Sequence, residues 1–169
     1  MWIAYILPML AAIILGGVLG LERNLAGKTA GMRTYAMVSL GSALFVIISN
    51  SVFMTYFKAG VTSINPLVMA SNVIVGIGFI GAGLVFLKDN KITGLTTAAG
   101  LWVSAGVGMA CGFGLYSLAI AAVIMALIVF TGMWLLENSF EKGMSYADHK
   151  YFFFGKKKNG EVKEGIIED

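Results

Sequence analysis

Charged residues are scarce in this sequence. Of its 169 residues, 12% are Asp, Glu, Lys or Arg and 58% are hydrophobic. A soluble domain usually carries about 25% charged residues, so an ordinary water-soluble domain is excluded. The one cysteine, Cys111, excludes an intrachain disulfide and is expected to be a small packing residue.

Histidine is almost absent as well. The one histidine, His149, has no Cys or His partner nearby, so the sequence offers no zinc motif. No nucleophile and base stand at a recognisable spacing, and we therefore expect no enzyme. The net charge of +3 does not indicate a nucleic-acid partner, because the anionic inner leaflet of a membrane attracts the same lysines and arginines.

What the sequence does contain is long runs without charge. They cover residues 2–21, 34–57, 67–87 and 95–136. A bilayer core takes roughly 20 apolar residues per helix, so the first three runs are single spans and the last is two. The glycine-rich segment at 111–116 marks the turn inside the last run. The sequence predicts an all-α integral membrane protein with five transmembrane helices, at residues 2–21, 34–57, 67–87, 95–112 and 115–136.

The lysines and arginines give the orientation. If the N-terminus lies outside, every Lys and Arg except Lys58 lies on the cytoplasmic side. Cytoplasmic loops of membrane proteins carry this excess, so we expect the N-terminus outside and the C-terminus inside. Residues 1–137 then form the transmembrane helical domain, and residues 138–169 form a short polar cytoplasmic tail.

An internal repeat relates the two halves of the helical region. Shifted by 63 residues, Gly20–Ala36 falls on Gly83–Ala99 with six identical positions. Such copies would make the first two helices a parallel repeat of the third and fourth. In a chain so rich in Gly, Leu and Ala, six matches do not establish a duplication.

The segment GIGFIGAG, residues 76–83, matches the G-x-G-x-x-G pattern of dinucleotide-binding turns. That motif needs a preceding strand, but this segment lies within an apolar span, so a nucleotide site is rejected. Small residues instead let membrane helices approach closely. At 100° per residue they give the third helix two smooth faces, which predicts a helix sandwiched in the bundle. On the fourth helix, small residues recur every four positions and form a strip along one face; they are Gly100, Ser104, Gly108 and Gly112. We expect this strip to pack against the third helix or a second copy of the protein. The predicted helix-packing residues are Ser71, Asn72, Gly76, Gly78, Gly81, Gly83, Gly100, Ser104 and Gly108.

A polar cluster is expected where the cytoplasmic loops meet the helices. One interpretation of its basic residues is topology and contact with lipid phosphates. The other is a functional site in which Glu22 pairs with an arginine and the helix starts converge, with Glu22 as a candidate metal ligand. The predicted cluster comprises Glu22, Arg23, Gly31, Arg33, Thr34, Gly94, Thr96 and Thr97.

Several spaced motifs within residues 10–115 resemble the MgtC/SapB family of bacterial inner-membrane proteins. They are G-x-E-R from Gly20, A-G-x-R-T from Ala30, G-x-G-F-x-G-A-G from Gly76 and G-L-x-T-A-A-x-x-W from Gly94. The resemblance implies a multi-pass protein of the inner membrane that is linked to magnesium homeostasis. It also implies that Mg²⁺ is a ligand or substrate, with no other cofactor expected.

Two functions are compatible with this resemblance. One is transport of Mg²⁺ or another divalent cation, for which the spans offer weak support because they contain no Asp, Glu, Lys, Arg or His. The other is a non-transporting regulator that binds another membrane protein, such as the F-type ATP synthase. We expect a homo-oligomer, with a dimer favoured. MgtC itself carries a sizeable C-terminal cytoplasmic domain, so roles of that domain do not transfer to residues 138–169.

Overall fold

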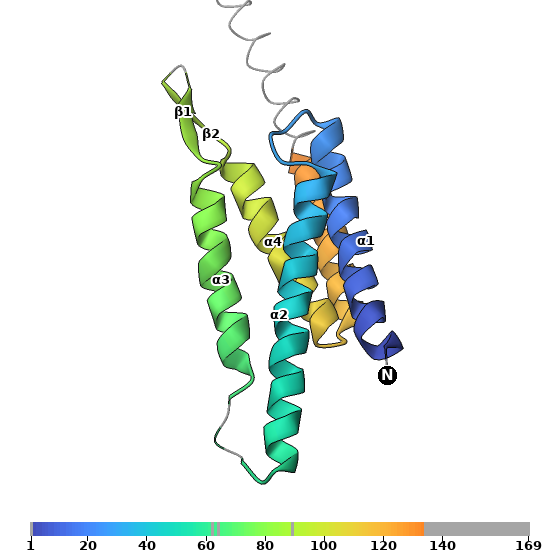
Figure 1. Ribbon diagram of the computed structural model, residues 1–169. Coiled ribbons are helices and arrows are strands. Elements are labelled where there is room, and N and C mark those ends of the chain that lie inside the picture. Colours follow the sequence, from blue (N-terminus) through green and yellow to red (C-terminus); the bar gives the residue numbers. More distant parts are fainter. Residues whose placement is uncertain (1, 62, 64, 89, 134–169) are drawn as a thin grey trace, which may run out of the picture. The chain divides into compact units, whose positions relative to one another are not determined.

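Apolar helices dominate the fold (Figure 1). The computed structural model describes residues 2–61, 63, 65–88 and 90–133. The chain divides into two compact units, residues 1–127 and 128–169. Its elements are α1 (Ile3–Leu25), α2 (Met32–Lys58), α3 (Leu67–Ala82), β1 (Phe86–Lys88), β2 (Lys91–Thr93) and α4 (Leu95–Gly112), and a fifth helix covers Tyr116–Met133.

The predicted five-helix membrane fold is confirmed. Four of the helices, α1, α2, α4 and the fifth, are long and apolar enough to cross a membrane. α4 has the predicted bounds, and α2 begins two residues before its predicted start. α1 continues four residues past its predicted end at residue 21, because leucine, glutamate and arginine are good helix formers. The predicted tail, residues 138–169, lies outside the described residues.

The third span differs from its prediction. α3 ends at Ala82 rather than at residue 87, and β1 and β2 follow it as an antiparallel hairpin. Glycines around residue 82 weaken the helix, and the β-branched and aromatic residues beyond it favour strands. Gly94, with φ +90°, ends the hairpin; a Cβ added there would overlap the carbonyl oxygen of Leu84, so only glycine fits without strain.

Small residues hold α1, α2 and α4 together. A Cβ added at Gly16 would lie 2.6 Å from the Cβ of Ser39, and one added at Gly112 would lie 2.8 Å from the carbonyl oxygen of Ala43. A Cβ added at Gly108 would overlap the carbonyl oxygen of Ser39. The three backbones therefore touch, which is how membrane helices gain dispersion energy in the absence of a hydrophobic driving force.

The strip of small residues on α4 packs against α2. The expectation that it packs against α3 is therefore wrong. Gly100, Ser104 and Gly108 are all buried. The partner is α2 because its small and polar residues, such as Ser39, leave room for a close backbone approach. α3 contacts α4 through Gly81, whose added Cβ would lie 3.5 Å from that of Ala98.

The described residues do not enclose α3 on two faces. The buried residues of α3 are Ile77 and Gly81, and among the described residues nothing lies within 4 Å of a Cβ added at Gly76 or Gly78. The sandwiched helix is therefore not formed by these residues alone, because α3 contacts α4 and, less extensively, α2 but buries few residues against them. Packing by the exposed members of the set stays a prediction about a surface beyond this chain; they are Ser71, Asn72, Gly76, Gly78 and Gly83.

Two connections that contain basic residues lie at the same end of the bundle; they are the α1–α2 connection, with Lys28, and the β1–β2 hairpin, with Lys91. Figure 1 shows the α1–α2 connection and the β1–β2 hairpin together at one end, opposite the Lys58 end of α2. α2 and α4 begin 63 residues apart, at Met32 and Leu95, each after a glycine cap. This arrangement fits both the predicted orientation and the parallel repeat, which stay predictions.

Candidate functional site

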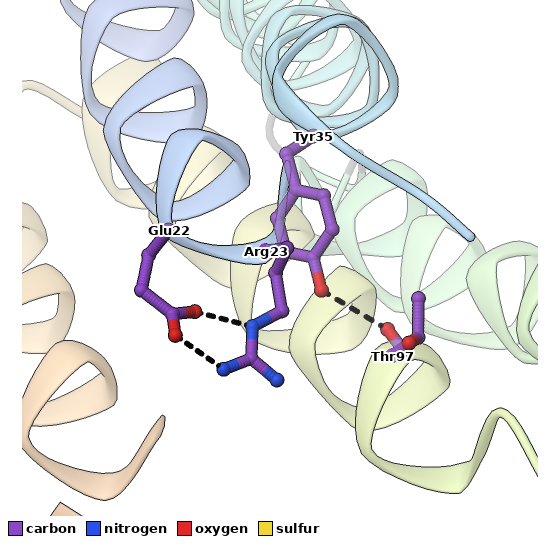
Figure 2. A network of polar contacts seen from close by, with 4 residues as sticks. All are labelled: Glu22, Arg23, Tyr35 and Thr97. Atoms are coloured by element: carbon purple, nitrogen blue, oxygen red, sulfur yellow. Dashed lines mark hydrogen bonds and ion pairs between the residues drawn. The ribbon is translucent and has the colours of Figure 1, made fainter. Parts of the chain in front are cut away.

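An ion pair marks the end of α1. Arg23 donates to both carboxylate oxygens of Glu22, through Nε and through Nη2, the latter at 2.7 Å (Figure 2). Side-chain exposure is 4% for Arg23 and 22% for Glu22. The prediction that Glu22 pairs with an arginine is confirmed, and the pair is bidentate, which is the strongest geometry for these groups.

Glycines bring the start of α2 against this pair. A Cβ added at Gly20 would lie 2.6 Å from the Cα of Met32 and 2.8 Å from the Cβ of Tyr35. A Cβ added at Gly31 would lie 2.7 Å from Oδ1 of Asn24. The G-x-E-R and A-G-x-R-T motifs therefore face each other, and their glycines permit the contact.

Tyr35 links α2 to the first turn of α4. It is fully buried, and its hydroxyl donates to the carbonyl oxygen of Thr97 at 3.2 Å (Figure 2). Its own carbonyl oxygen accepts a hydrogen bond from Oγ of Ser104 at 2.9 Å. Figure 2 shows the Arg23 side chain beside the Tyr35 ring. One residue thus connects the end of α1 with α2 and α4.

Tyr35 is not among the site residues predicted from the sequence. The signal was present, because the buried positions of α2 follow a helical spacing of three or four residues, and Tyr35 opens that row. The next member of the row, Ser39, has a buried hydroxyl without a hydrogen-bond partner among the described residues.

The structure brings together part of the predicted cluster. Glu22, Arg23 and Thr97 lie around Tyr35 (Figure 2). Gly31 and Gly94 precede α2 and α4 as expected. The remaining three residues are exposed, and no described contact draws them into the cluster; they are Arg33, Thr34 and Thr96.

Glu22 is poorly placed to serve as a free metal ligand. It is the one acidic residue within the described ranges, and Arg23 occupies both of its oxygens. No group of three His, Cys, Asp or Glu side chains suited to a metal occurs in that part of the chain. A Mg²⁺ ion at Glu22 would share the carboxylate with the guanidinium, whose positive charge opposes the ion, and would find no second carboxylate among the described residues.

A comparison with known protein families identifies the family of this chain. The MgtC family model matches residues 9–139. This range contains Tyr35 and the residues around it, which are Glu22, Arg23 and Thr97. The chain belongs to the MgtC family. Together with its four membrane-length helices, this makes it a multi-pass membrane protein.

Curated relatives within the MgtC family match at about 40% identity. The protein named "Putative magnesium transporter YhiD" of Escherichia coli K12 is 41% identical over 74% of this chain and 58% of its own length. Protein MgtC of Salmonella typhimurium LT2 is 40% identical over 73% of this chain and 49% of its own. Protein MgtC of Brucella abortus is 42% identical over 70% and 46%, respectively. This chain thus spans about half the length of these relatives. No solved structure matches it.

The Tyr35 hydroxyl offers a first test of the cluster. Tyr35→Phe removes the hydrogen bond to Thr97 and should lower the free energy of unfolding by about 1 kcal/mol. Tyr56→Phe, at an exposed position on the same helix, should leave it unchanged. Denaturation in mixed micelles, followed by circular dichroism, measures both. Equal stability of Tyr35→Phe and the wild type would show that this bond does not hold α4 in place.

Proposed function

We propose that this chain acts in magnesium homeostasis in the bacterial inner membrane as a regulator that contacts other membrane proteins, without carrying the ion itself. The observation that carries the proposal is the bidentate pair, in which Arg23 engages both oxygens of Glu22. Mg²⁺ is bound in proteins by one or two carboxylates together with its retained waters. The one carboxylate of the described residues is already neutralised by Arg23.

The geometry of the spans supports the same proposal. Ion pathways through membranes usually contain ionisable residues that face the interior of the bundle. The interior of this bundle, where α1, α2 and α4 meet, is filled by small residues in backbone contact, such as Gly16 and Gly108. α3 instead presents a broad apolar surface, as a helix that binds a partner in the membrane would.

Transport is the second candidate. The observation that favours it is the name of the YhiD relative, which refers to magnesium transport. In a transporter, a hydrated cation would have to reach the Glu22 carboxylate against the positive charge of Arg23. Glu22→Gln would remove that charge and end the flux.

A flux assay separates the two candidates. The full chain is reconstituted into liposomes that contain a magnesium-sensitive dye, and a Mg²⁺ gradient is applied across the membrane. The regulator predicts the same dye response as in protein-free liposomes, with an ionophore as the positive control. A wild-type flux that disappears in Glu22→Gln and persists in Lys58→Gln, at the opposite end of α2, would overturn the regulator in favour of transport.

We further propose that α3 mediates assembly, first of all into a dimer. Gly76→Leu and Gly78→Leu should each lower the assembled fraction, because they fill positions where a neighbouring helix could approach closely. Val75→Leu, at a site where the side chain is already large and exposed, is the matched control. Energy transfer between labelled copies in vesicles measures assembly. If one glycine variant assembles as the wild type does, that face of α3 is not an interface.

A protein partner is tested separately from self-assembly. Chemical cross-linking in native membranes, followed by purification of the full chain, should recover a second membrane protein, for which the F-type ATP synthase is the family-based candidate. Recovery of cross-links between copies of this chain alone would remove support for the regulator and leave only self-assembly.

A further inference from the structure

α3 is too short to cross a bilayer core by itself. Its 16 residues span about 24 Å at 1.5 Å per residue, whereas the hydrocarbon core is about 30 Å thick. α1 and α2 have 23 and 27 residues and are long enough. The helix is therefore about 6 Å shorter than the core, and on one side it is continued by the residues that follow Ala82, which lead directly into the β1–β2 hairpin (Figure 1).

The hairpin carries exposed apolar side chains on one face and lysines next to its turn. Leu87 pairs with Ile92 in the antiparallel register, and they are 68% and 63% exposed. Lys88 and Lys91 are the next pair in the register, beside the turn, and Lys91 is exposed. In the sequence, residues 88–91 carry a net charge of +1.

Neither bulk water nor the hydrocarbon core suits this hairpin. In water, Leu87 and Ile92 would leave a large apolar surface uncovered. In the core, a two-stranded sheet would leave the backbone groups of both edges without partners, which lipid chains cannot satisfy. At the boundary between the two, apolar side chains reach the lipid chains, while backbone edges and lysines reach water and phosphates.

We infer that the β1–β2 hairpin is an interfacial anchor in the leaflet on the side of the two basic connections. The side chains of Leu87 and Ile92 enter the outer part of the lipid chains, and Lys91 stays at the level of the phosphates. The hairpin leads through Gly94 into α4, so its depth fixes where α4 and Thr97 begin. This inference rests on membrane insertion and is independent of the proposed function.

Spin labels measure the depth directly. In the full chain with Cys111→Ala, single cysteines are introduced as Leu87→Cys, Ile92→Cys and, as the matched control, Lys91→Cys. Each variant carries a nitroxide and is reconstituted into vesicles of phosphatidylcholine and phosphatidylglycerol. Should Cys111→Ala reduce the yield, the same sites can be labelled with Cys111 present, because this residue is fully buried.

The accessibility of each label to oxygen and to a water-soluble nickel complex decides the outcome. An interfacial anchor predicts that labels at 87 and 92 collide several-fold more with oxygen than with nickel, and that the label at 91 shows the reverse. Equal nickel accessibility at all three sites would place the hairpin in water and overturn the inference. Low accessibility to both reagents at 87 and 92 would mean that protein covers them, and it would overturn the inference equally.

Discussion

Gly108→Ala should destabilise the bundle by about 3 kcal/mol, the upper end of the usual range for overpacked cores. The added methyl group would overlap the carbonyl oxygen of Ser39, and a backbone atom cannot move aside as a side chain can. α2 and α4 would have to separate, and this would also weaken the hydrogen bond from Ser104 to Tyr35. Denaturation in mixed micelles measures the loss, and Gly108→Leu should prevent folding altogether.

Gly106→Ala is the matched control for this prediction. It lies two residues away on the same helix, and nothing lies within 4 Å of its added Cβ among the described residues. Alanine favours a helix over glycine by roughly 1 kcal/mol, so this variant should be as stable as the wild type or slightly more stable. If both variants had the same stability, the close contact between α2 and α4 would be refuted.

Glu22→Gln should have the second large effect. It removes the carboxylate that faces the buried guanidinium of Arg23, and breaking a buried ion pair from one side typically lowers stability by about 3–5 kcal/mol. Because Glu22 is 22% exposed, water relieves part of the loss, and we expect about 3 kcal/mol.

A double-mutant cycle isolates the pair. Glu22→Gln with Arg23→Gln replaces both charges by neutral amides, so the double variant should be more stable than Glu22→Gln alone. It should not reach the wild type, because Arg23 takes part in a further interaction. If the two substitutions were simply additive, the two groups would not be coupled energetically.

The helices could be predicted from the sequence because the bilayer imposes one simple requirement. A span needs a sufficient length of apolar residues, and the charge-free runs show that length directly. The end of α1 was misplaced because charge was taken as a boundary. Glu22 and Arg23 neutralise each other and can therefore continue the helix.

The hairpin could not be predicted in the same way. Composition alone does not separate an apolar helix end from an apolar strand, and residues 83–87 suit both. The register of Leu87 with Ile92 and the left-handed conformation of Gly94 settle the matter, and both are properties of the folded backbone. The average hydropathy of a sequence segment does not reveal the strand register or the conformation of Gly94.

The candidate site was predicted in part. Glu22, Arg23 and Thr97 stand out because charged or polar residues at the ends of apolar runs are conspicuous. Tyr35 was not predicted because an aromatic residue in an apolar span is also typical of a lipid-facing position. Its hydrogen-bond partner, Thr97, is 62 positions away in the chain, so the sequence around Tyr35 does not indicate the contact. Arg33 was equally conspicuous but is exposed. The sequence identifies polar groups, whereas helix rotation decides which of them meet.

The sparse attachment of α3 has a consequence for the order in which the protein opens. α1, α2 and α4 share backbone contacts and buried hydrogen bonds, whereas α3 buries Ile77 and Gly81 alone. A segment with so few buried contacts opens at a lower free energy than the rest of a fold. In detergent micelles, α3 should therefore detach from the bundle at a lower denaturant concentration than the one that separates α2 from α4, so the third helix behaves as a separate cooperative unit within one bundle.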